Sequence, residues 1–441
     1  MLIPALMLAA AAPLGAPQTA PNTAWDPDWE AAEMWCLTEH VQLTDQTFFM
    51  KAGESYFSPD GHMIIFQGTP RPEGDEPAGK HYGMYFVPAI RDDSGNITGT
   101  GKPVLLSEPG SANTCGWFHP TDYTADERYT VLFGTTTTAP DDTASSGYQR
   151  GTSRYTWQFP NEMEVVAAYI ENATGRGEEN ENLAGWPGFV PHWNAKVISP
   201  LWTRDGYDAE ASWSPDARHV LYTRLAPGSA DGDLWIYDTV TETHTELVAE
   251  PGYDGGPFFS PDGTRICYRS DRKGDKALQL YISELAFDDS GRVTGVEREI
   301  PVTDNGHVNW APFFTPDGSM LFYATSEVSH ANYEVFAIDA TGDRPPSERA
   351  SVRITHARGF DGLPVFTPDG SWMMWTAQRG QLVEGETRPS SQLWAAKVDL
   401  VAVKSRLKAN QQTLDDALEE KAFEEGFDEF NPGGPDDGME P

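Results

Sequence analysis

Short acidic and amide side chains recur at one position ahead of the apolar segments of this sequence. Five segments carry them there, at Asn113, Asp208, Asp254, Asn309 and Asp361, and Ala52 takes the same position in a sixth. Two residues further on, Glu54 and Glu210 add carboxylates to their own segments. Hard cations such as calcium take oxygen ligands of this kind. We call the six residues at this aligned position the column. It predicts a ring that binds a polar ligand, or a divalent cation held by Asp208, Asp254 and Asp361.

The same column also has a structural interpretation. Three of its aspartates end the triplets Gly-Tyr-Asp or Gly-Phe-Asp at 206–208, 252–254 and 359–361. An Asp side chain in a tight turn accepts hydrogen bonds from nearby backbone N–H groups. A feature repeated in segment after segment suits such a capping role as well as a ligand site, so the sequence leaves both interpretations open.

Basic residues follow the paired segments, at Arg269, Arg272 and Arg379. A guanidinium group binds carboxylates in bidentate geometry. These arginines are therefore predicted to join the ligand-binding set or to form salt bridges with the acidic column. Three histidines occur in loops of different kinds, so their spacing does not predict a zinc site: His307, His330 and His356.

The elements that must position these residues form an internal repeat. Two apolar segments flank a turn that reads Ser/Thr-Pro-Asp-Gly or a variant of it, at 56–67, 117–134, 212–223, 258–269, 313–324 and 365–376. Proline presets the second position of a type I turn, and Asp and Gly suit the positions after it. The β-branched and aromatic flanks favour strands. A third apolar strand follows each copy, as at 333–338 after the fifth copy. A fourth strand precedes each copy, as at 103–108 before the second copy.

Six copies of four strands predict an all-β protein, a six-bladed β-propeller of four-stranded blades. The strand at 40–45 precedes any blade that it could finish, while the last blade ends at its third strand, 392–398. We therefore predict that the N-terminal strand completes the last blade and closes the ring.

These strand pairs, with the Gly-Tyr-Asp or Gly-Phe-Asp triplets before them at 206–216, 252–263 and 359–370, resemble the TolB-like β-propeller family, whose blades are WD40-like Pro-Asp repeats. The resemblance covers about residues 37–400. It implies the fold, but similar blades serve binding proteins, peptidase gating domains and a few lyases.

The repeat also divides the chain. Residues 1–16 are apolar and uncharged and end in small residues, which predicts a signal peptide over residues 1–20 and hence a periplasmic or secreted protein. Residues 21–36 form an N-terminal extension, and 37–405 form the propeller, with loop insertions at 135–160 and 171–195. Residues 406–441 begin with a helical pattern and are predicted to become an acidic tail.

Charge and composition exclude several classes of partner. With 31 Lys and Arg against 67 Asp and Glu, the formal net charge is -36, which is unsuited to binding a polyanion such as nucleic acid. No later segment is apolar over the ~18 residues of a membrane span. Three cysteines do not make a disulfide framework. We expect a monomeric propeller.

Three functions fit these observations. The first is an exported, non-catalytic scaffold that binds a protein, a peptide or another ligand through the channel-mouth face. This is the face on which the first strand of each blade starts, opposite the Pro-Asp-Gly turns. The second is a metal-dependent lyase or hydrolase that acts on a polar substrate at the central channel. The third is a structural component of an envelope assembly. The sequence has no G-x-S-x-G, H-E-x-x-H or G-x-x-x-x-G-K-S/T motif, which favours the first.

Overall fold

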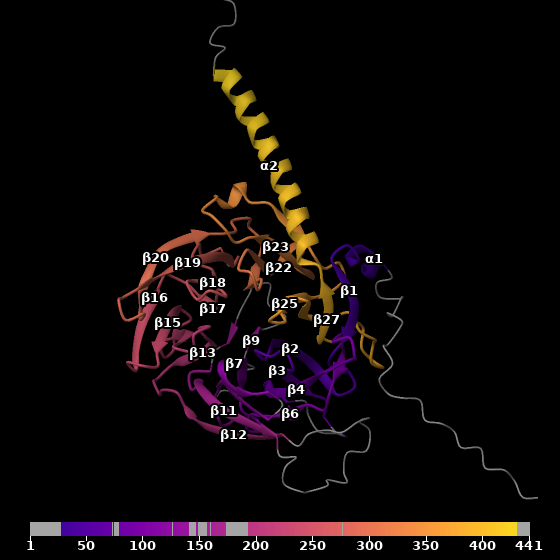
Figure 1. Ribbon diagram of the computed structural model, residues 1–441, viewed down its shortest axis with the longest axis vertical. Coiled ribbons are helices and arrows are strands. Elements are labelled where there is room, and N and C mark those ends of the chain that lie inside the picture. Colours follow the sequence, from indigo (N-terminus) through magenta and orange to yellow (C-terminus); the bar gives the residue numbers. More distant parts are fainter. Residues whose placement is uncertain are drawn as a thin grey trace, which may run out of the picture.

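The computed structural model describes residues 28–72, 74, 79–125, 127–140, 147–148, 157–158, 160–172, 193–275 and 277–429. The predicted signal peptide and most of the two insertions lie outside these residues. The described chain forms a ring of six antiparallel sheets, which confirms the predicted six-bladed propeller (Figure 1).

The first three blades use the strands of the first half of the chain. They are β2 (Phe49–Phe57), β3 (Met63–Pro70), β4 (Gly83–Arg91), β5 (Ile97–Thr100) and β6 (Val104–Leu105) in blade 1; β7 (Asn113–Thr124), β8 (Arg128–Thr135), β11 (Glu164–Asn172) and β12 (Trp193–Pro200) in blade 2; and β13 (Tyr207–Trp213), β14 (His219–Leu225), β15 (Gly232–Asp238) and β16 (Thr243–Val248) in blade 3. A short hairpin, β9 (Gly147–Tyr148) and β10 (Trp157–Gln158), lies within the first insertion.

The last three blades follow the same order. They are β17 (Asp254–Phe259), β18 (Arg265–Ser270), β19 (Gln279–Phe287) and β20 (Val293–Pro301) in blade 4; β21 (Asn309–Phe314), β22 (Met320–Ser329), β23 (Asn332–Asp339) and β24 (Ser351–Arg353) in blade 5; and β25 (Asp361–Phe366), β26 (Trp372–Ala377), β27 (Gln392–Val398) and β1 (Leu37–Gln42) in blade 6. The first strands of neighbouring blades contact one another around the centre of the ring.

The Ser/Thr-Pro-Asp-Gly motif makes one turn with a fixed set of hydrogen bonds. In blade 1 the hydroxyl of Ser58 donates to Asp60 at 2.5 Å and accepts the N–H of Met63, the first residue of β3, at 2.9 Å. The corresponding Ser or Thr makes the same pair of bonds in blades 3 to 6. The hydroxyl of the Ser or Thr therefore ties the turn to the start of the second strand.

Strand β1 closes the ring as predicted. It pairs antiparallel with β27, and the register places Leu37 opposite Val398 and Gln42 opposite Trp394. Leu37 is fully buried in the core of blade 6. The ring is therefore closed by pairing between β1, the first strand in the chain, and the sheet formed by the last three strands, β25 to β27.

The outer edge of blade 1 differs from the single fourth strand predicted at 103–108. Two short strands, β5 and β6, both pair with β4 there. Gly101 and Pro103 fall between them. Proline cannot donate a ladder hydrogen bond and glycine weakens a strand, so the edge is interrupted at this point.

Two α-helices and one short 3-10 helix accompany blades 5 and 6 in the described chain. Helix α1 (Trp29–Glu33) precedes β1, and η2 (Pro346–Glu348) is a short turn before β24. Helix α2 (Leu400–Glu429) follows β27, packs against β23 and β24 of blade 5, and buries Val403 and Leu407 in a core cluster shared by blades 5 and 6. It then extends away from the ring (Figure 1). In the described part of the chain, no helix combines the length and the apolar character that crossing a membrane requires.

Candidate channel site

A β-bulge interrupts the first strand of every blade at the same point. The residue there adopts a left-handed conformation, with φ between 45° and 59°, at Glu54, Cys115, Glu210, Gly256, Ala311 and Leu363. We call these residues the bulge ring. Because the conformation costs a non-glycine residue about 1 kcal/mol and still recurs in all six blades, it is a property of the blade architecture. The chemistry of the channel is set by the side chains that the bulges carry.

The polar residues of the bulge ring come from blades 1 to 3. Glu54 accepts a hydrogen bond from the thiol of Cys115 at 2.7 Å and from the hydroxyl of Tyr56 at 3.4 Å. Burial raises the pKa of Glu54, and the charge of Glu210 adds to this, while the Cys115 hydrogen bond acts in the opposite direction. No Lys, Arg or His of the described chain forms an ion pair with Glu54.

Cys115 is a hydrogen-bond donor in this arrangement. Burial and the charge of Glu54 hold the pKa of its thiol well above the usual range. Since the thiolate is the nucleophilic form of cysteine, this environment does not activate Cys115 for covalent catalysis.

Glu210 is enclosed by partners from the next blade. Its carboxylate accepts hydrogen bonds from the Tyr253 hydroxyl and the Gly256 N–H, each at 2.5 Å, and pairs with Arg269 at 3.3 Å. A Cβ atom on Gly256 would lie 1.6 Å from Nη1 of Arg269, so a side chain there would displace the guanidinium from Glu210. The structure thus places the predicted ligand residue Arg269 as the counter-ion of Glu210.

The predicted column of Asp and Asn is buried. Its aspartates and its asparagines have different kinds of partner. Each aspartate pairs with an arginine from the second strand of its own blade or the loop after it: Asp208 with Arg224 at 2.8 Å, Asp254 with Arg272 at 3.1 Å and Asp361 with Arg379 at 2.5 Å. The two asparagines instead donate to backbone carbonyls, Asn113 to that of Tyr82 and Asn309 to that of His307. Asp thus occurs where an arginine is available and Asn where none is.

The pairing of each aspartate with an arginine argues against the predicted cation site. Each of the three aspartates is occupied by its own guanidinium, and each is at most 1% exposed. Within the residues that the structure describes, no three His, Cys, Asp or Glu side chains gather as metal ligands. The arrangement does not fit a calcium ion shared by Asp208, Asp254 and Asp361. The ligand-binding role of the column stays a prediction.

Arg379 links the channel wall to the N-terminal extension. Its guanidinium donates to Glu33 of α1 at 2.9 and 3.0 Å as well as to Asp361, and the Trp29 ring lies 4.2 Å from it. Although burial acts to raise it, Arg379 and His40 lower the pKa of Glu33 to about 2. Burial raises the pKa of Asp361 to about 6, against the effect of Arg379. One guanidinium therefore serves two buried carboxylates.

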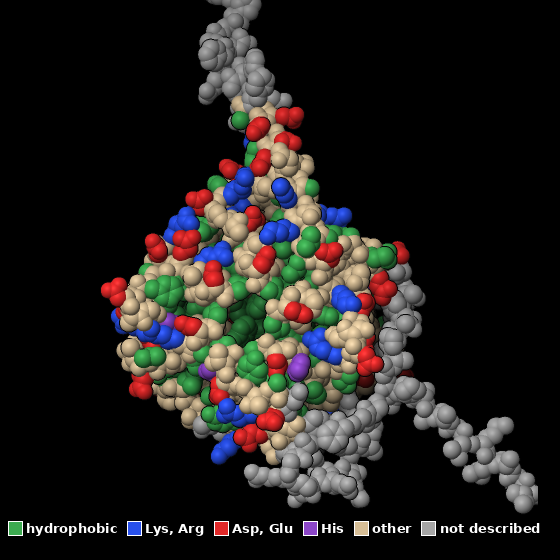
Figure 2. All heavy atoms as spheres, viewed as in Figure 1, with side chains coloured by type: hydrophobic (Ala, Val, Ile, Leu, Met, Phe, Trp, Pro, Cys, Tyr) green, Lys and Arg blue, Asp and Glu red, His purple; other side chains and the backbone are tan. Residues whose placement is uncertain are grey.

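A small hollow adjoins the other half of the bulge ring. Its volume is about 10 Å³, the space of about one water molecule, and its lining is mostly apolar: Ser55, Tyr56, Phe258, Ala311, Phe313, Leu363, Pro364 and Val365. The aromatic rings pack against one another across the channel, with Phe258 and Phe313 centroids 5.1 Å apart and Tyr56 and Phe258 centroids 5.6 Å apart. Figure 2 shows the hollowed centre of the ring walled by hydrophobic side chains.

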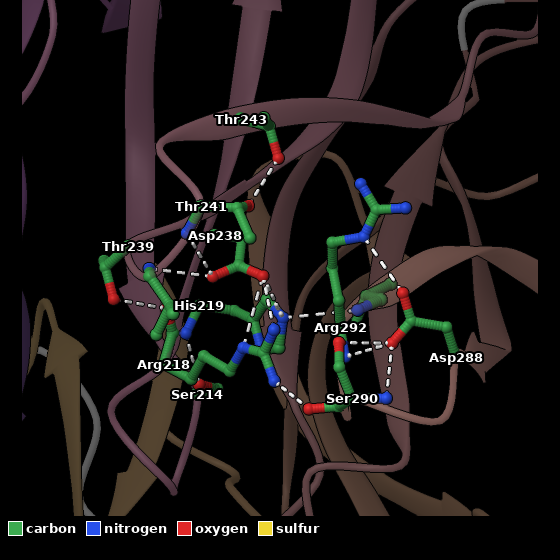
Figure 3. A network of polar contacts seen from close by, with 12 residues as sticks. Ser214, Arg218, His219, Asp238, Thr239, Thr241, Thr243, Asp288, Ser290 and Arg292 are labelled. Atoms are coloured by element: carbon green, nitrogen blue, oxygen red, sulfur yellow. Dashed lines mark hydrogen bonds and ion pairs between the residues drawn. The ribbon is translucent and has the colours of Figure 1, made fainter.

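A Ser, a His and an Asp also lie near one another in blade 3, but they do not form a catalytic triad (Figure 3). The hydroxyl of Ser214 donates to Asp216, and it accepts the backbone N–H of His219 rather than facing the imidazole. The Nε2 atom of that ring accepts the N–H of Val293 at 3.3 Å. A triad needs the hydroxyl on one ring nitrogen and the carboxylate on the other, so this network joins blade 3 to blade 4 structurally.

The Asp238 carboxylate of this network is held by one arginine and by two backbone N–H groups. Arg218 donates to Asp238 at 2.7 Å. Although burial acts to raise it, hydrogen bonds from Arg218, Val240 and Thr241 lower the pKa of Asp238 to about 2.

Comparisons with known proteins agree with the resemblance found in the repeat. The chain is similar to the Tol-Pal system protein TolB of Wolinella succinogenes, 28% identical over 171 residues that cover 38% of this chain and 36% of that protein. It is also similar to the uncharacterized peptidase YuxL of Bacillus subtilis, 22% identical over 38% of this chain and 29% of the peptidase. No protein-family model matches the chain. The matched segments thus span about a third or less of these relatives.

Solved structures share the propeller only loosely with this chain. TolB from Acinetobacter baumannii aligns with a TM-score of 0.42 at 15% identity, over 78% of this chain and 65% of that one. A luciferin-regenerating enzyme aligns with a TM-score of 0.43 at 9% identity, over 82% and 96%. These scores carry no argument about function. The resemblance to TolB-like propellers predicted from the motif is confirmed, and the fold itself follows from the strand pairing.

Proposed function

We propose that this protein is an exported, TolB-like scaffold that binds a protein or peptide through the channel-mouth face without catalysing a reaction. The observation that carries the proposal is the composition of the channel wall. Carboxylates and hydroxyls stand on one side of the bulge ring, and an apolar hollow stands on the other. A wall of this kind offers a docked protein an apolar surface together with a few polar contacts.

The state of the reactive groups supports binding over catalysis. The Cys115 thiol is kept protonated, and Glu210 is engaged by Arg269 and Tyr253. The Cys115 thiol does lie 2.7 Å from the Glu54 carboxylate, but burial and that charge favour the thiol over the nucleophilic thiolate. The resemblance to TolB and the net charge of -36 are both compatible with a periplasmic or secreted monomer that recognises another protein.

Site-specific photocrosslinking tests the proposal in the cells that make the protein. A benzoylphenylalanine is placed at Leu363, which lines the hollow, and in a matched variant at Val240, which is 72% exposed on the rim. Leu363 already has a positive φ, so another L side chain adds no new backbone strain there. We expect one protein adduct from the channel position and none from the rim.

Binding with purified components then decides the matter. The crosslinked protein, identified by mass spectrometry, should bind the wild-type propeller and the Val240→Trp variant equally, and bind Leu363→Trp at least ~10-fold more weakly because the indole changes the shape of the channel wall. Equal binding by both variants, or adducts from the rim position alone, would refute the channel-mouth proposal.

A further inference from the structure

Blade 1 lacks two polar side chains that the other five blades share. In every blade the column residue on the first strand pairs with a residue of the second strand, which pairs in turn with one on the third strand. In blade 1 the two outer members of this row are Ala52 and Gly83. The third-strand members of the other blades are all acids or amides: Glu164, Asp233, Gln279, Glu334 and Gln392.

In blades 5 and 6 the third-strand side chain accepts a hydrogen bond from a hydroxyl just beyond the fourth strand. The Thr355 hydroxyl donates to Glu334 at 2.7 Å, and the Thr44 hydroxyl donates to Gln392 at 2.7 Å. The oxygen of each hydroxyl also accepts a backbone N–H of the third strand. The threonine therefore needs both a backbone donor and a side-chain acceptor to satisfy its hydroxyl.

Ser107 is the counterpart of these threonines in blade 1. Its oxygen accepts the N–H of Met84 at 3.1 Å, and the residue is 6% exposed. Because Gly83 has no side chain to act as the acceptor, no described residue accepts the proton of the Ser107 hydroxyl. Buried hydroxyls are normally hydrogen-bonded, so this one points to a ligand that supplies the missing acceptor.

A cavity of about 460 Å³ lies where the side chains are missing. Gly83 and Tyr85 of β4 line it together with Leu105, which pairs with Tyr85 across the sheet, and Ser107 just beyond β6. The Tyr85 ring and the Leu105 side chain offer apolar surface. A volume of this size is typical of sites for small molecules, which run from about 300 to 1,000 Å³.

This corner of a blade favours a neutral acyl group over an anion. Burial raises the pKa of Asp233 to about 6, that of Glu164 to about 7 and that of Glu334 to about 9. The remaining two blades have glutamine there, which carries no charge. A carboxamide is therefore the group best suited to the empty position in blade 1.

Gln279 shows the hydrogen bonds that a carboxamide makes there. Its oxygen accepts from Asn309 of the next blade at 3.0 Å, and its NH₂ group donates to the backbone carbonyl of His307 at 3.0 Å. Two residues likewise separate Ser111 from Asn113 in blade 2, and the Ser111 carbonyl accepts from Asn113 just as that of His307 accepts from Asn309. Ser111 lines the cavity. An acceptor for a carboxamide NH₂ group is thus in place.

We propose that the cavity of blade 1 binds a small molecule through a primary carboxamide that takes the place of the side chain missing at Gly83. The Ser107 hydroxyl donates to the carboxamide oxygen, and the NH₂ group donates to the Ser111 carbonyl. Exposed Lys80 and Glu108 bring opposite charges to the rim, and neither has an ion-pair partner among the described residues. A zwitterionic head group matches them, so free glutamine combines the features required. This site lies outside the channel and does not depend on the scaffold role.

Isothermal titration of the full chain with three amino acids isolates the carboxamide. L-Glutamine is compared with L-glutamate, which has the same size but a charged side chain at pH 7, and with L-norleucine, which has an apolar side chain of similar length. We expect saturable binding of glutamine and binding at least ~10-fold weaker for the other two, because a site built on hydrogen bonds rejects ligands that leave its groups unpaired.

Gly83→Gln supplies the missing carboxamide from the chain itself and should abolish the binding of glutamine. A Cβ atom at Gly83 would meet Cδ1 of Leu105 at 2.8 Å, but Leu105 is 40% exposed and has room to move. The matched control is Gly295→Gln, where a Cβ atom meets nothing within 4 Å. The control should bind glutamine as wild type does.

A second pair of variants removes the hydroxyl. Ser107→Ala should weaken glutamine by ~10-fold or more. Thr303→Ala is its control, because the Thr303 hydroxyl accepts the third-strand N–H of Leu280 at 2.9 Å in the same way but lies in blade 4, away from the cavity. Thr303→Ala should leave binding unchanged. If Gly83→Gln does not fold, this pair still decides the matter.

Three results would overturn the inference. The first is the absence of saturable glutamine binding by the wild-type chain. The second is equal binding of glutamate or norleucine, which would remove the role of the carboxamide. The third is glutamine binding that survives in either folded cavity variant, Gly83→Gln or Ser107→Ala.

Discussion

Arg379→Met tests whether the buried guanidinium holds the N-terminal extension and the channel wall together. Arg379 is 3% exposed and donates to Glu33, which is fully buried, and to Asp361, which is 1% exposed. Methionine has a similar length and no charge, so the variant removes the cation while filling much of its volume. Asp361 would then lack its counter-ion, and Glu33 would keep only its contact with His40 at 2.9 Å.

The magnitude follows from the cost of neutralising those carboxylates. Breaking a buried ion pair from one side costs about 3–5 kcal/mol of unfolding free energy. Protonation limits the loss, because holding a carboxyl group of ordinary pKa near 4 in its neutral form costs about 4 kcal/mol at pH 7 and about 1.4 kcal/mol at pH 5. In the variant both carboxyl groups have raised pKa values, so its deficit should be largest at pH 7 and should shrink as the pH falls toward 5.

Urea unfolding followed by tryptophan fluorescence, at pH 7 and pH 5, measures this deficit against wild type. The matched control is Arg298→Met, because Arg298 also joins two carboxylates, Glu284 and Asp343, but is 46% exposed. The control should cost at most about 1 kcal/mol at either pH. A deficit for Arg379→Met below about 1 kcal/mol at pH 7, or one that does not change with pH, would refute the reasoning.

Three further variants test the fold and the channel. Asp238→Asn should lower the free energy of unfolding by about 2 kcal/mol at pH 7, because a native pKa of about 2 stabilises the fold above pH 4. This stabilisation is lost as the pH falls through 2. Urea unfolding at pH 7 and pH 2.5 should therefore show a smaller difference between variant and wild type at the lower pH. Leu37→Ala should lose about 3 kcal/mol by leaving a cavity where β1 closes the ring, whereas Thr38→Ala, exposed on the same strand, should be near neutral in thermal unfolding. Gly256→Ala should lose about 2 kcal/mol in urea, because its methyl group would displace Arg269 from its carboxylate, and a loss no larger than that of Gly295→Ala, where a Cβ meets nothing within 4 Å, would contradict the packing argument.

The blades could be predicted from the sequence because their signals are local. The strand predicted at 392–398 is β27, and that predicted at 333–338 is β23, Asn332–Asp339. Turn chemistry and strand alternation act over a few residues, and six repetitions remove the ambiguity of any one copy. Closure was predictable for the same reason, since counting strands leaves one without a partner at each end.

The channel residues were harder to find from the sequence. The bulge ring lies two residues beyond the Asp and Asn column in each blade, so aligning the copies would have placed Cys115 beside Glu54 and Glu210. The signal was present, but a bulge shifts the alternation of side chains and cannot be seen in a pattern of period two. Helix α1 was also missed as a partner of the channel wall, because five residues carry too little periodicity.

The sequence by itself determined the number of blades, the order of their strands and the way the ring closes, because each depends on contacts between residues close in the chain or on counting. Only the tertiary structure decided which acids are neutralised. Glu33 and Arg379 are separated by 346 positions and lie 2.9 Å apart. Ion pairing depends on distance and burial, so Asp208, Asp254 and Asp361 became satisfied parts of their blades, and Glu54 was left facing the channel without an ion pair among the described residues.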